Sequence, residues 1–185
     1  KKLGLLGKFY SGLSGKDKSS FTNGNKKYIQ YLNIFDSVII DSSFEDYGQV
    51  YIEEGENQNK VNYGDILFTQ SSETIKEIGM TTVYLGRSEV YLNSFSFGFR
   101  FGESKNINYL YIAYLFRTNN IRKLIIREGQ GSTRFNLSSN RLKDICLPLP
   151  SLPEQKKIGR LFFTIDKKLE LQQKRIEALE EYKKG

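Results

Sequence analysis

The sequence contains no histidine and a single cysteine among its 185 residues, and these shortages exclude several kinds of chemistry. Without histidine, a histidine general base, a histidine-ligated zinc site and a serine–histidine dyad are all impossible. A single cysteine excludes an internal disulfide framework and is typical of a protein in a reducing cytoplasm. Because Cys146 lies in an apolar, strand-like run, we expect it to be a small buried core residue.

Cofactor and membrane signals are also missing. The sequence has no P-loop, Rossmann fingerprint, methyltransferase-like motif or signal peptide, and its longest apolar run, Tyr109 to Phe116, is too short to span a bilayer. The acids between Asp41 and Glu56 lack the nearby lysine and strand spacing of a magnesium nuclease. The chain begins with Lys1 rather than methionine, as expected of a trimmed chain or a piece of a longer one. We therefore expect a cytoplasmic, non-catalytic chain that binds no metal or cofactor and contacts no membrane.

The charges, by contrast, are numerous and unevenly distributed. Residues 1–27 carry seven lysines against Asp17, residues 37–103 carry eleven acids against four bases, and residues 105–143 carry eight bases against Glu128. If the two basic segments meet in the fold, they form one positive face, which is typical of a nucleic-acid partner. The alternative is a solvated surface on which charges cluster by accident.

Two glycine-bearing loops within the basic segments contain residues suited to DNA contact. The first spans residues 11–18 and the second spans residues 130–136. Small residues let main-chain amides approach phosphates, and lysine or arginine adds charge; glutamine, asparagine and arginine can also bind purine edges with two hydrogen bonds. The candidates are Ser14, Lys16, Lys18, Gln130, Ser132, Thr133, Arg134 and Asn136. Each loop taken alone also fits an ordinary turn.

The C-terminal segment predicts a long helix. Ser151 and Glu154 form a capping-box pattern with Pro153 in the first turn, and about 32 residues from Pro153 to Lys184 would make a rod of roughly 48 Å. A heptad seam, with one polar residue, follows the coiled-coil repeat. Its members are Ile158, Phe162, Ile165, Leu169, Gln172, Ile176 and Leu179.

This helix has two interpretations. An amphipathic terminal helix can simply dock on its own domain. A narrow seam, unusual length, and nine Lys/Arg with six Asp/Glu on the other faces favour a partner helix instead. The acidic positions Asp166 and Glu180 and the basic positions Lys168 and Arg175 flank the seam, and such sorting selects partners and mildly favours a parallel pair.

The remaining periodicity predicts an α/β head with a mixed, twisted sheet and packed helices. Cys146 and its neighbours lead as a strand into the C-terminal helix, and Gly98 to Gly102 indicates a half-buried strand with Arg100 pointing outward. Two helices are expected, at 106–118 and 121–128. Strands are expected at 28–31, 38–40, 49–52, 66–69, 82–85 and 94–101.

Segments along the whole chain resemble one family. The run from Pro150 to Asp166, with its Pro-Glu-Gln-Lys-Lys-Ile-Gly core, resembles the helix that follows a target recognition domain in specificity subunits of type I restriction–modification systems. Residues 12–16, 64–73, 130–138 and 145–150 are similar to segments of such domains. Ordinary specificity subunits have two recognition domains and two such helices, whereas this chain has one of each.

The resemblance implies a target recognition domain at residues 1–150 and a spacer or dimerisation helix at 151–185. It adds Gln70 and Ser71 as DNA contacts, and it implies an antiparallel helix pair that joins this head to a second recognition domain. It also implies methyltransferase and restriction–translocase partners, which use S-adenosylmethionine, ATP and magnesium. The alternative from another class is a coiled-coil adaptor whose basic face binds RNA or an acidic partner.

Overall fold

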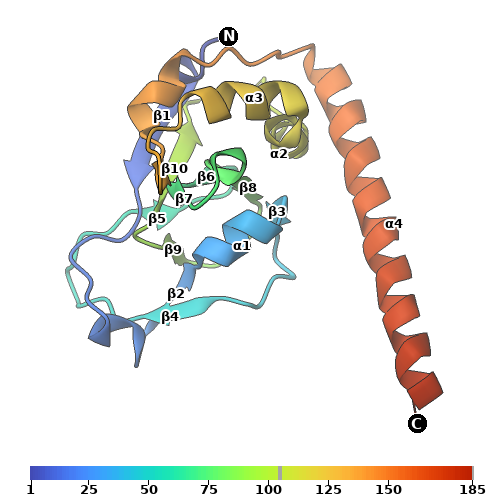
Figure 1. The fold of residues 1–185 in the computed structure, drawn as a ribbon, viewed down its shortest axis with the longest axis horizontal. Helices are drawn as coiled ribbons and strands as arrows, with labels where there is room; N and C mark the ends of the chain where they lie inside the picture. Colours follow the sequence, from blue (N-terminus) through green and yellow to red (C-terminus); the bar gives the residue numbers. More distant parts are fainter. Residues whose placement is uncertain (104–105, 185) are drawn as a thin grey trace.

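The computed structural model describes residues 1–103 and 106–184, which form an α/β head and one long C-terminal helix (Figure 1). A five-stranded sheet has the order β1-β10-β6-β8-β3, and a four-stranded sheet has the order β4-β2-β9-β5. Neighbours are antiparallel except for the pairs β3–β8 and β2–β9. The strands are β1 (Gly7–Ser11), β2 (Lys26–Ile29), β3 (Ile39–Ile40), β4 (Gly48–Val50), β5 (Lys60–Val61), β6 (Ile66–Thr69), β7 (Ser71–Ser72), β8 (Thr81–Tyr84), β9 (Val90–Leu92), β10 (Ser96–Phe101) and β11 (Phe135–Asn136).

Helices α2 and α3 cover one face of the larger sheet, α1 lies on the opposite face, and short 3₁₀ turns join the elements. α2 and α3 lie over this sheet, and α1 lies against β6 and β8 (Figure 1). Asn108 caps α2 by accepting a hydrogen bond from the Tyr111 amide, and Thr118 does the same for α3 through Ile121. The helices are α1 (Tyr31–Asp36), α2 (Tyr109–Arg117), α3 (Asn119–Arg127) and α4 (Leu152–Lys184); the 3₁₀ turns are η1 (Leu3–Leu5), η2 (Ser19–Phe21), η3 (Ile75–Glu77) and η4 (Ser139–Asp144).

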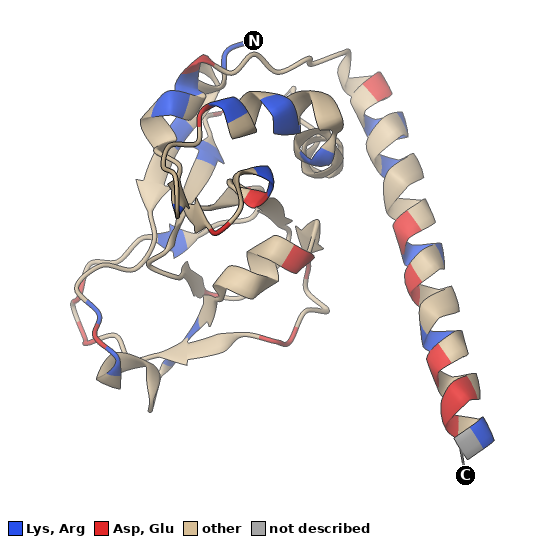
Figure 2. Cartoon of the chain, in the orientation of Figure 1, with Lys and Arg blue, Asp and Glu red and all other residues tan. Residues whose placement is uncertain are grey.

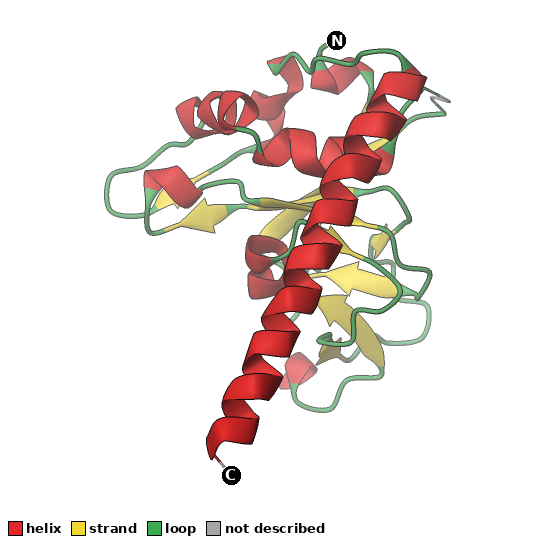
Figure 3. Cartoon of the chain, turned by 90° about the vertical axis from the view of Figure 1, so that its right-hand side faces the viewer, coloured by secondary structure: helices red, strands yellow, loops and turns green. Residues whose placement is uncertain are grey.

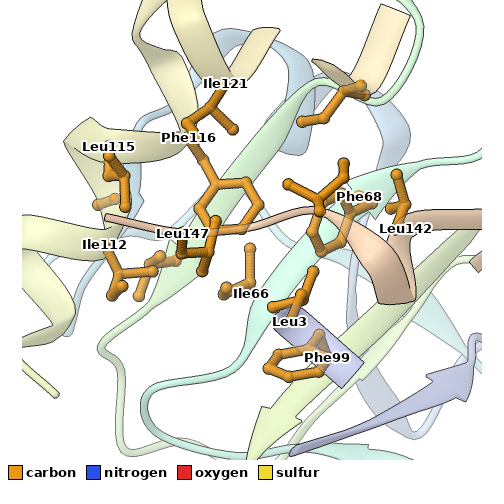
Figure 4. Close-up of a cluster of buried hydrophobic side chains, with 14 of the residues drawn as sticks. Leu3, Ile66, Phe68, Phe99, Ile112, Leu115, Phe116, Ile121, Leu142 and Leu147 are labelled. Carbon is orange, nitrogen blue, oxygen red and sulfur yellow. The ribbon is translucent and has the colours of Figure 1, made fainter. Parts of the chain in front are cut away.

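Strand β6 lies at the centre of the core and is buried on both faces. Ile66 and Phe68 point into the cluster beneath α2 and α3, where Phe68 packs edge-on against Phe116 (Figure 4). Leu67 points the opposite way into a second cluster. Successive strand residues alternate between faces, so one four-residue apolar run supplies both clusters.

The six numbered strands and the helices are confirmed with shifted ends, whereas β1, β5, β7, β9, β11 and α1 were not predicted, and the expected strand through Cys146 is only an isolated bridge. Two expectations were wrong in detail. Tyr31 begins α1 instead of ending a strand. Cys146 is exposed, because it forms an isolated bridge with Lys2 and the neighbouring residues Ile145 and Leu147 take the inward positions.

Helix α4 begins at Leu152 and leaves the head after packing its first turns against α2 (Figure 3). The Glu154 carboxylate accepts hydrogen bonds from the Ser151 amide at 3.0 Å and the Ser151 hydroxyl at 2.6 Å. These bonds lower the pKa of Glu154. The predicted capping role of Glu154 is therefore confirmed, although the Ser151 hydroxyl donates to this carboxylate.

Candidate nucleic-acid interface

Main-chain hydrogen bonds join two of the predicted DNA-contact loops. Gln130 and Asn136 exchange amide–carbonyl bonds of 2.9 and 2.7 Å, which closes the 130–136 loop as a hairpin. β11 then pairs with β7, opposite Ser71, and the Leu137 amide donates to the Gln70 carbonyl at 2.8 Å. Gly131 has φ +130°, and a Cβ there would lie 2.1 Å from the Arg134 carbonyl oxygen, so the hairpin requires glycine.

The third loop completes a polar cleft of about 560 Å³. The 11–18 loop is anchored where the Gly12 amide donates to the Ser96 carbonyl at 3.1 Å and the Leu13 amide donates to the Leu92 carbonyl at 2.8 Å. Its Ser14 then lines the cleft together with Gln70, Gln130 and Asn136. The structure therefore brings together four predicted contact residues from three segments that lie far apart in the sequence.

Arg134 lines an adjoining cleft of about 390 Å³ and is hydrogen-bonded to Ser71. Its Nη2 donates to the Ser71 hydroxyl at 3.2 Å, and Ser71 is only 7% exposed. The Tyr31 hydroxyl donates to the Ser71 carbonyl at 2.7 Å, and burial raises the pKa of Tyr31. Ser71 was predicted as a DNA contact, but its burial suits it to orient Arg134 rather than to touch a ligand.

Lys16 is tied to the protein rather than free for a ligand. Its ammonium donates to the Glu56 carboxylate at 2.5 Å, and the Lys16 side chain is 7% exposed. Hydrogen bonds from Lys16 and then from Gln58 lower the pKa of Glu56 to about 2. The pair is therefore intact above the ordinary carboxyl pKa near 4.5 and is lost only as the pH falls toward 2. Lys18, Ser132 and Thr133, in contrast, are exposed.

Lysines and arginines alternate with aspartates and glutamates over the chain (Figure 2), and ion pairs like that of Lys16 reduce the predicted positive face. Lys2 pairs with Asp144 and Lys26 with Glu89, each at 2.8 Å, and the second pair joins the first basic segment to the acidic one. Arg117 is partly buried and donates to four main-chain carbonyls, and desolvation lowers its pKa to about 10. Several bases counted as candidate DNA charge therefore stabilise the fold instead.

Arg122 is buried and also stabilises the fold through main-chain carbonyls. Its guanidinium donates to the carbonyls of Gly79 and Ile78, both at 2.6 Å, and of Lys76 at 3.0 Å. Buried guanidinium groups need acceptors for their fixed donors, and these carbonyls at the end of η3 provide them. Arg122 therefore fastens α3 to the turn that follows Thr74.

Helix α4 uses one face for docking and leaves the heptad seam exposed. The docking face holds Gln155, which is 1% exposed, and Gly159, against which α2 packs directly. The Tyr114 hydroxyl donates to Asp166 at 2.8 Å. On the adjacent seam, Ile158, Phe162, Ile165, Leu169, Ile176 and Leu179 are 38–63% exposed. Docking on its own domain is therefore confirmed for one face, and pairing of the exposed seam with a partner helix stays a prediction.

Sequence reasoning missed the turn at Ser94 and Phe95, which borders the polar cleft. It was taken as the start of a strand, but β10 begins at Ser96, and the Phe95 carbonyl accepts a hydrogen bond from the Gln70 amide at 3.0 Å. The dipeptide Asn93-Ser94 was an available turn signal. In the described ranges 1–103 and 106–184, no cluster of three or more potential ligands fits a metal ion, and no helix is long and apolar enough to cross a membrane.

The architecture places this chain in a class of proteins with an α/β head and a long projecting helix. Chains of three solved structures share the fold, each aligning with 92% of this chain. One comes from a study of complex assembly and conformational transition in a type I restriction–modification system (TM-score 0.58, 17% identity, 38% of that chain). The others are the S subunit from M. genitalium (0.55, 12%, 39%) and the HsdS subunit from Thermoanaerobacter tengcongensis (0.55, 16%, 37%).

The sequence identifies the family more narrowly. The chain belongs to the type I restriction modification DNA specificity domain family, whose model matches residues 10–181. It is 29% identical over 168 residues to a protein of Methanocaldococcus jannaschii provisionally named type I restriction enzyme MjaX specificity subunit. That match covers 87% of this chain and 39% of the relative, so the chain spans about two-fifths of the length of such proteins.

Proposed function

We propose that this chain recognises one half of a bipartite sequence in double-stranded DNA, as half of the specificity unit of a type I restriction–modification system. The observation that carries the proposal is the polar cleft, where Ser14, Gln70, Gln130 and Asn136 converge beside Arg134. Amide and guanidinium groups in such a cluster can bind base edges, and the exposed residues Lys18, Ser132 and Thr133 can bind phosphates. The family membership supports the same assignment.

Assembly would follow from α4. Its exposed seam offers a surface for the equivalent helix of a second recognition domain, which is either a second copy of this chain or another part of a longer one. In this proposal the assembled unit lies in the cytoplasm and recruits methyltransferase and restriction–translocase subunits. Those subunits, not this chain, bind S-adenosylmethionine, ATP and magnesium and carry out the chemistry.

Selection of duplexes from a randomised DNA library tests the function. We expect the chain to enrich a bipartite site with two half-sites at a fixed spacing, and to bind with a log-affinity against log-salt slope of roughly −4 to −5. The purified chain should neither methylate nor cut DNA with magnesium, ATP and S-adenosylmethionine present. Weak binding without sequence preference would contradict the proposal and favour the adaptor with an RNA or acidic-protein partner.

A further inference from the structure

Two large apolar side chains are exposed beside the candidate interface. Leu32 and Phe95 are 65% and 63% exposed, and both line the Arg134 cleft. Both also line a further cleft of about 320 Å³, whose walls include Phe21 and Tyr28. Leu32 and Phe95 therefore form a ridge between two clefts, which we call the Leu32–Phe95 ridge.

Hydrogen bonds to the main chain of Phe95 fix one side of the ridge. The Phe95 amide donates to the Asn93 side-chain oxygen at 2.9 Å, and the Phe95 carbonyl accepts from the Gln70 amide at 3.0 Å. Asn93 is 5% exposed, and its amide group donates to the Ile29 carbonyl at 3.1 Å. An exposed aromatic side chain on a fixed main chain loses little conformational entropy when it binds, which suits it to act as an anchor.

The other side of the ridge is fixed in the same way. Leu32 lies in the first turn of α1, and the neighbouring Tyr31 hydroxyl holds this helix to the Ser71 carbonyl at 2.7 Å. Ser71 also binds Arg134, so a single residue positions both the apolar ridge and the predicted base-reading arginine. The ridge and Arg134 therefore line the same cleft and can contact the same ligand.

The surrounding groups favour nucleobases over the phosphate backbone as that ligand. Phe95, Leu32 and the Tyr31 ring are apolar surfaces that do not bind phosphate but match the flat face of a base. Glu73 and Glu77 also line the Arg134 cleft. Carboxylates repel phosphates, but they accept hydrogen bonds from the exocyclic amine of cytosine.

We propose that Phe95, supported by Leu32, inserts as a wedge at one base step of the bound DNA and partly unstacks it. Apolar wedges of this kind kink the duplex, and flexible pyrimidine–purine steps yield most easily. The ridge would therefore select for a deformable step at a fixed distance from the bases that Gln130, Arg134 and Asn136 contact. This inference rests on the proposed DNA-binding function and adds a specificity element to it.

Fluorescence of 2-aminopurine tests the wedge directly. The fluorophore replaces each adenine in turn in a duplex selected by the wild-type chain, and unstacking at one position should raise the emission when the chain binds. Phe95→Ala should abolish that rise and weaken binding roughly 5- to 150-fold, the range of base–aromatic stacking. Phe95→Tyr should preserve both. Leu5→Ala, at an 82% exposed position in η1, is the matched surface control and should change neither.

Each adverse outcome has a separate meaning. If wild type and Phe95→Ala bind the selected duplex equally and no position brightens, the wedge is overturned while the proposed function stands. If the wild-type chain selects no sequence at all, the proposed function fails first. If Phe95→Ala keeps full DNA affinity but loses binding to a methyltransferase subunit, the ridge is a protein-docking surface and the wedge proposal is wrong. Unchanged thermal unfolding of the variants excludes a folding defect.

Discussion

At the scale of single residues, the structure separates side chains that could touch DNA from side chains that hold them. Ser71 orients Arg134, Glu56 restrains Lys16, and Asn93 fixes the turn that carries Phe95. A hydrogen bond to a charged group favours one orientation of a long side chain and so preorganises it before its ligand arrives. The candidate interface therefore depends on residues that need not contact DNA.

Arg134→Ala should be the most damaging single substitution for DNA binding. Loss of a bidentate base contact should cost about 1–3 kcal/mol and relax specificity at one position, whereas loss of a phosphate contact should weaken all duplexes alike. Binding titrations against single-base variants of the selected duplex distinguish these results. Ser71→Ala should have a weaker effect in the same direction. An unchanged affinity for the Arg134→Ala chain would contradict our placement of the interface.

Glu56→Gln should strengthen DNA binding by releasing Lys16. The substitution removes one negative charge and leaves the ammonium free to neutralise a phosphate, so affinity near 0.1 M salt should rise by up to about tenfold and the salt slope should steepen by about 0.9. Salt titrations of wild type and variant measure both changes. In the double variant with Lys16→Ala the gain should disappear, and a gain that persists would show that Lys16 is not the group released.

At the scale of elements, α4 shows how one helix performs two tasks on neighbouring faces. Gln155, Gly159 and Asp166 lie on the side that meets α2, while Leu169, Ile176 and Leu179 lie on the exposed seam. The seam residue Phe162 lies where the two faces meet, because its ring centroid is 5.4 Å from that of Tyr114 in α2. Docking fixes the direction in which the helix leaves the head and leaves the seam beyond Phe162 exposed.

Gly159→Ala should loosen this docking. A Cβ there would lie 2.6 Å from the Tyr111 amide nitrogen and 2.9 Å from the Leu110 Cβ. Overpacking costs about 1–3 kcal/mol, against a gain of about 1 kcal/mol in helix propensity, so the free energy of unfolding should fall by up to about 2 kcal/mol. Chemical denaturation and hydrogen exchange in the first turns of α4 measure it. Arg160→Ala, at an exposed position, is the control, and a stabilised Gly159→Ala chain would show that the contact is loose.

At the scale of the whole molecule, the head and α4 have separate roles in the proposed function. The head would bind the DNA sequence, and α4 would set the distance between two heads. The 33 residues of α4 span about 50 Å, far more than docking on α2 requires. Seam residues 158–179 remain uncovered along most of that length. Such a surface would place a second head at a distance set by helix length.

Leu169→Glu should convert a two-fold dimer into a monomer. Leu169 is 63% exposed at the middle of the seam, and a buried carboxylate there would strongly oppose helix pairing. Light scattering at micromolar concentration should report a dimer for wild type and a monomer for the variant. Leu171→Glu, at a 51% exposed position off the seam, should remain dimeric. A monomeric wild-type chain at micromolar concentration would contradict the predicted homodimer.

Changing the length of α4 should change the spacing of the DNA half-sites. Insertion of one heptad after Gln172 preserves the seam and moves the heads apart by about 10.5 Å, or roughly three base pairs. Repeated library selection with the lengthened chain measures the new spacer. An unchanged spacer would mean that the length of α4 does not set the half-site spacing, and the adaptor function would then be the better explanation.

Local sequence patterns were sufficient for the elements with strong periodicity. Residue spacing and end signals, which act over a few residues, were sufficient to predict three kinds of element. These are the apolar strand at 66–69, the helices that end at Arg117 and Arg127, and the 33-residue helix α4. Strands β1, β5 and β9 were missed because each depends on pairing with a strand distant in the sequence rather than on local periodicity. Cys146 was misplaced because its side of the bridge depends on pairing with Lys2.

The amino-acid sequence by itself determined the family, the α/β class, the long helix with its seam, and the polar loops from which an interface could be built. Only the tertiary structure decided which of those residues meet, because β11–β7 pairing and the Gly12 and Leu13 amide bonds join segments more than 50 residues apart. The tertiary structure also decided which lysines and arginines are available to bind DNA. Arg117, Arg122 and Lys16 look like DNA charge in the sequence, but burial requires each to find a partner within the fold.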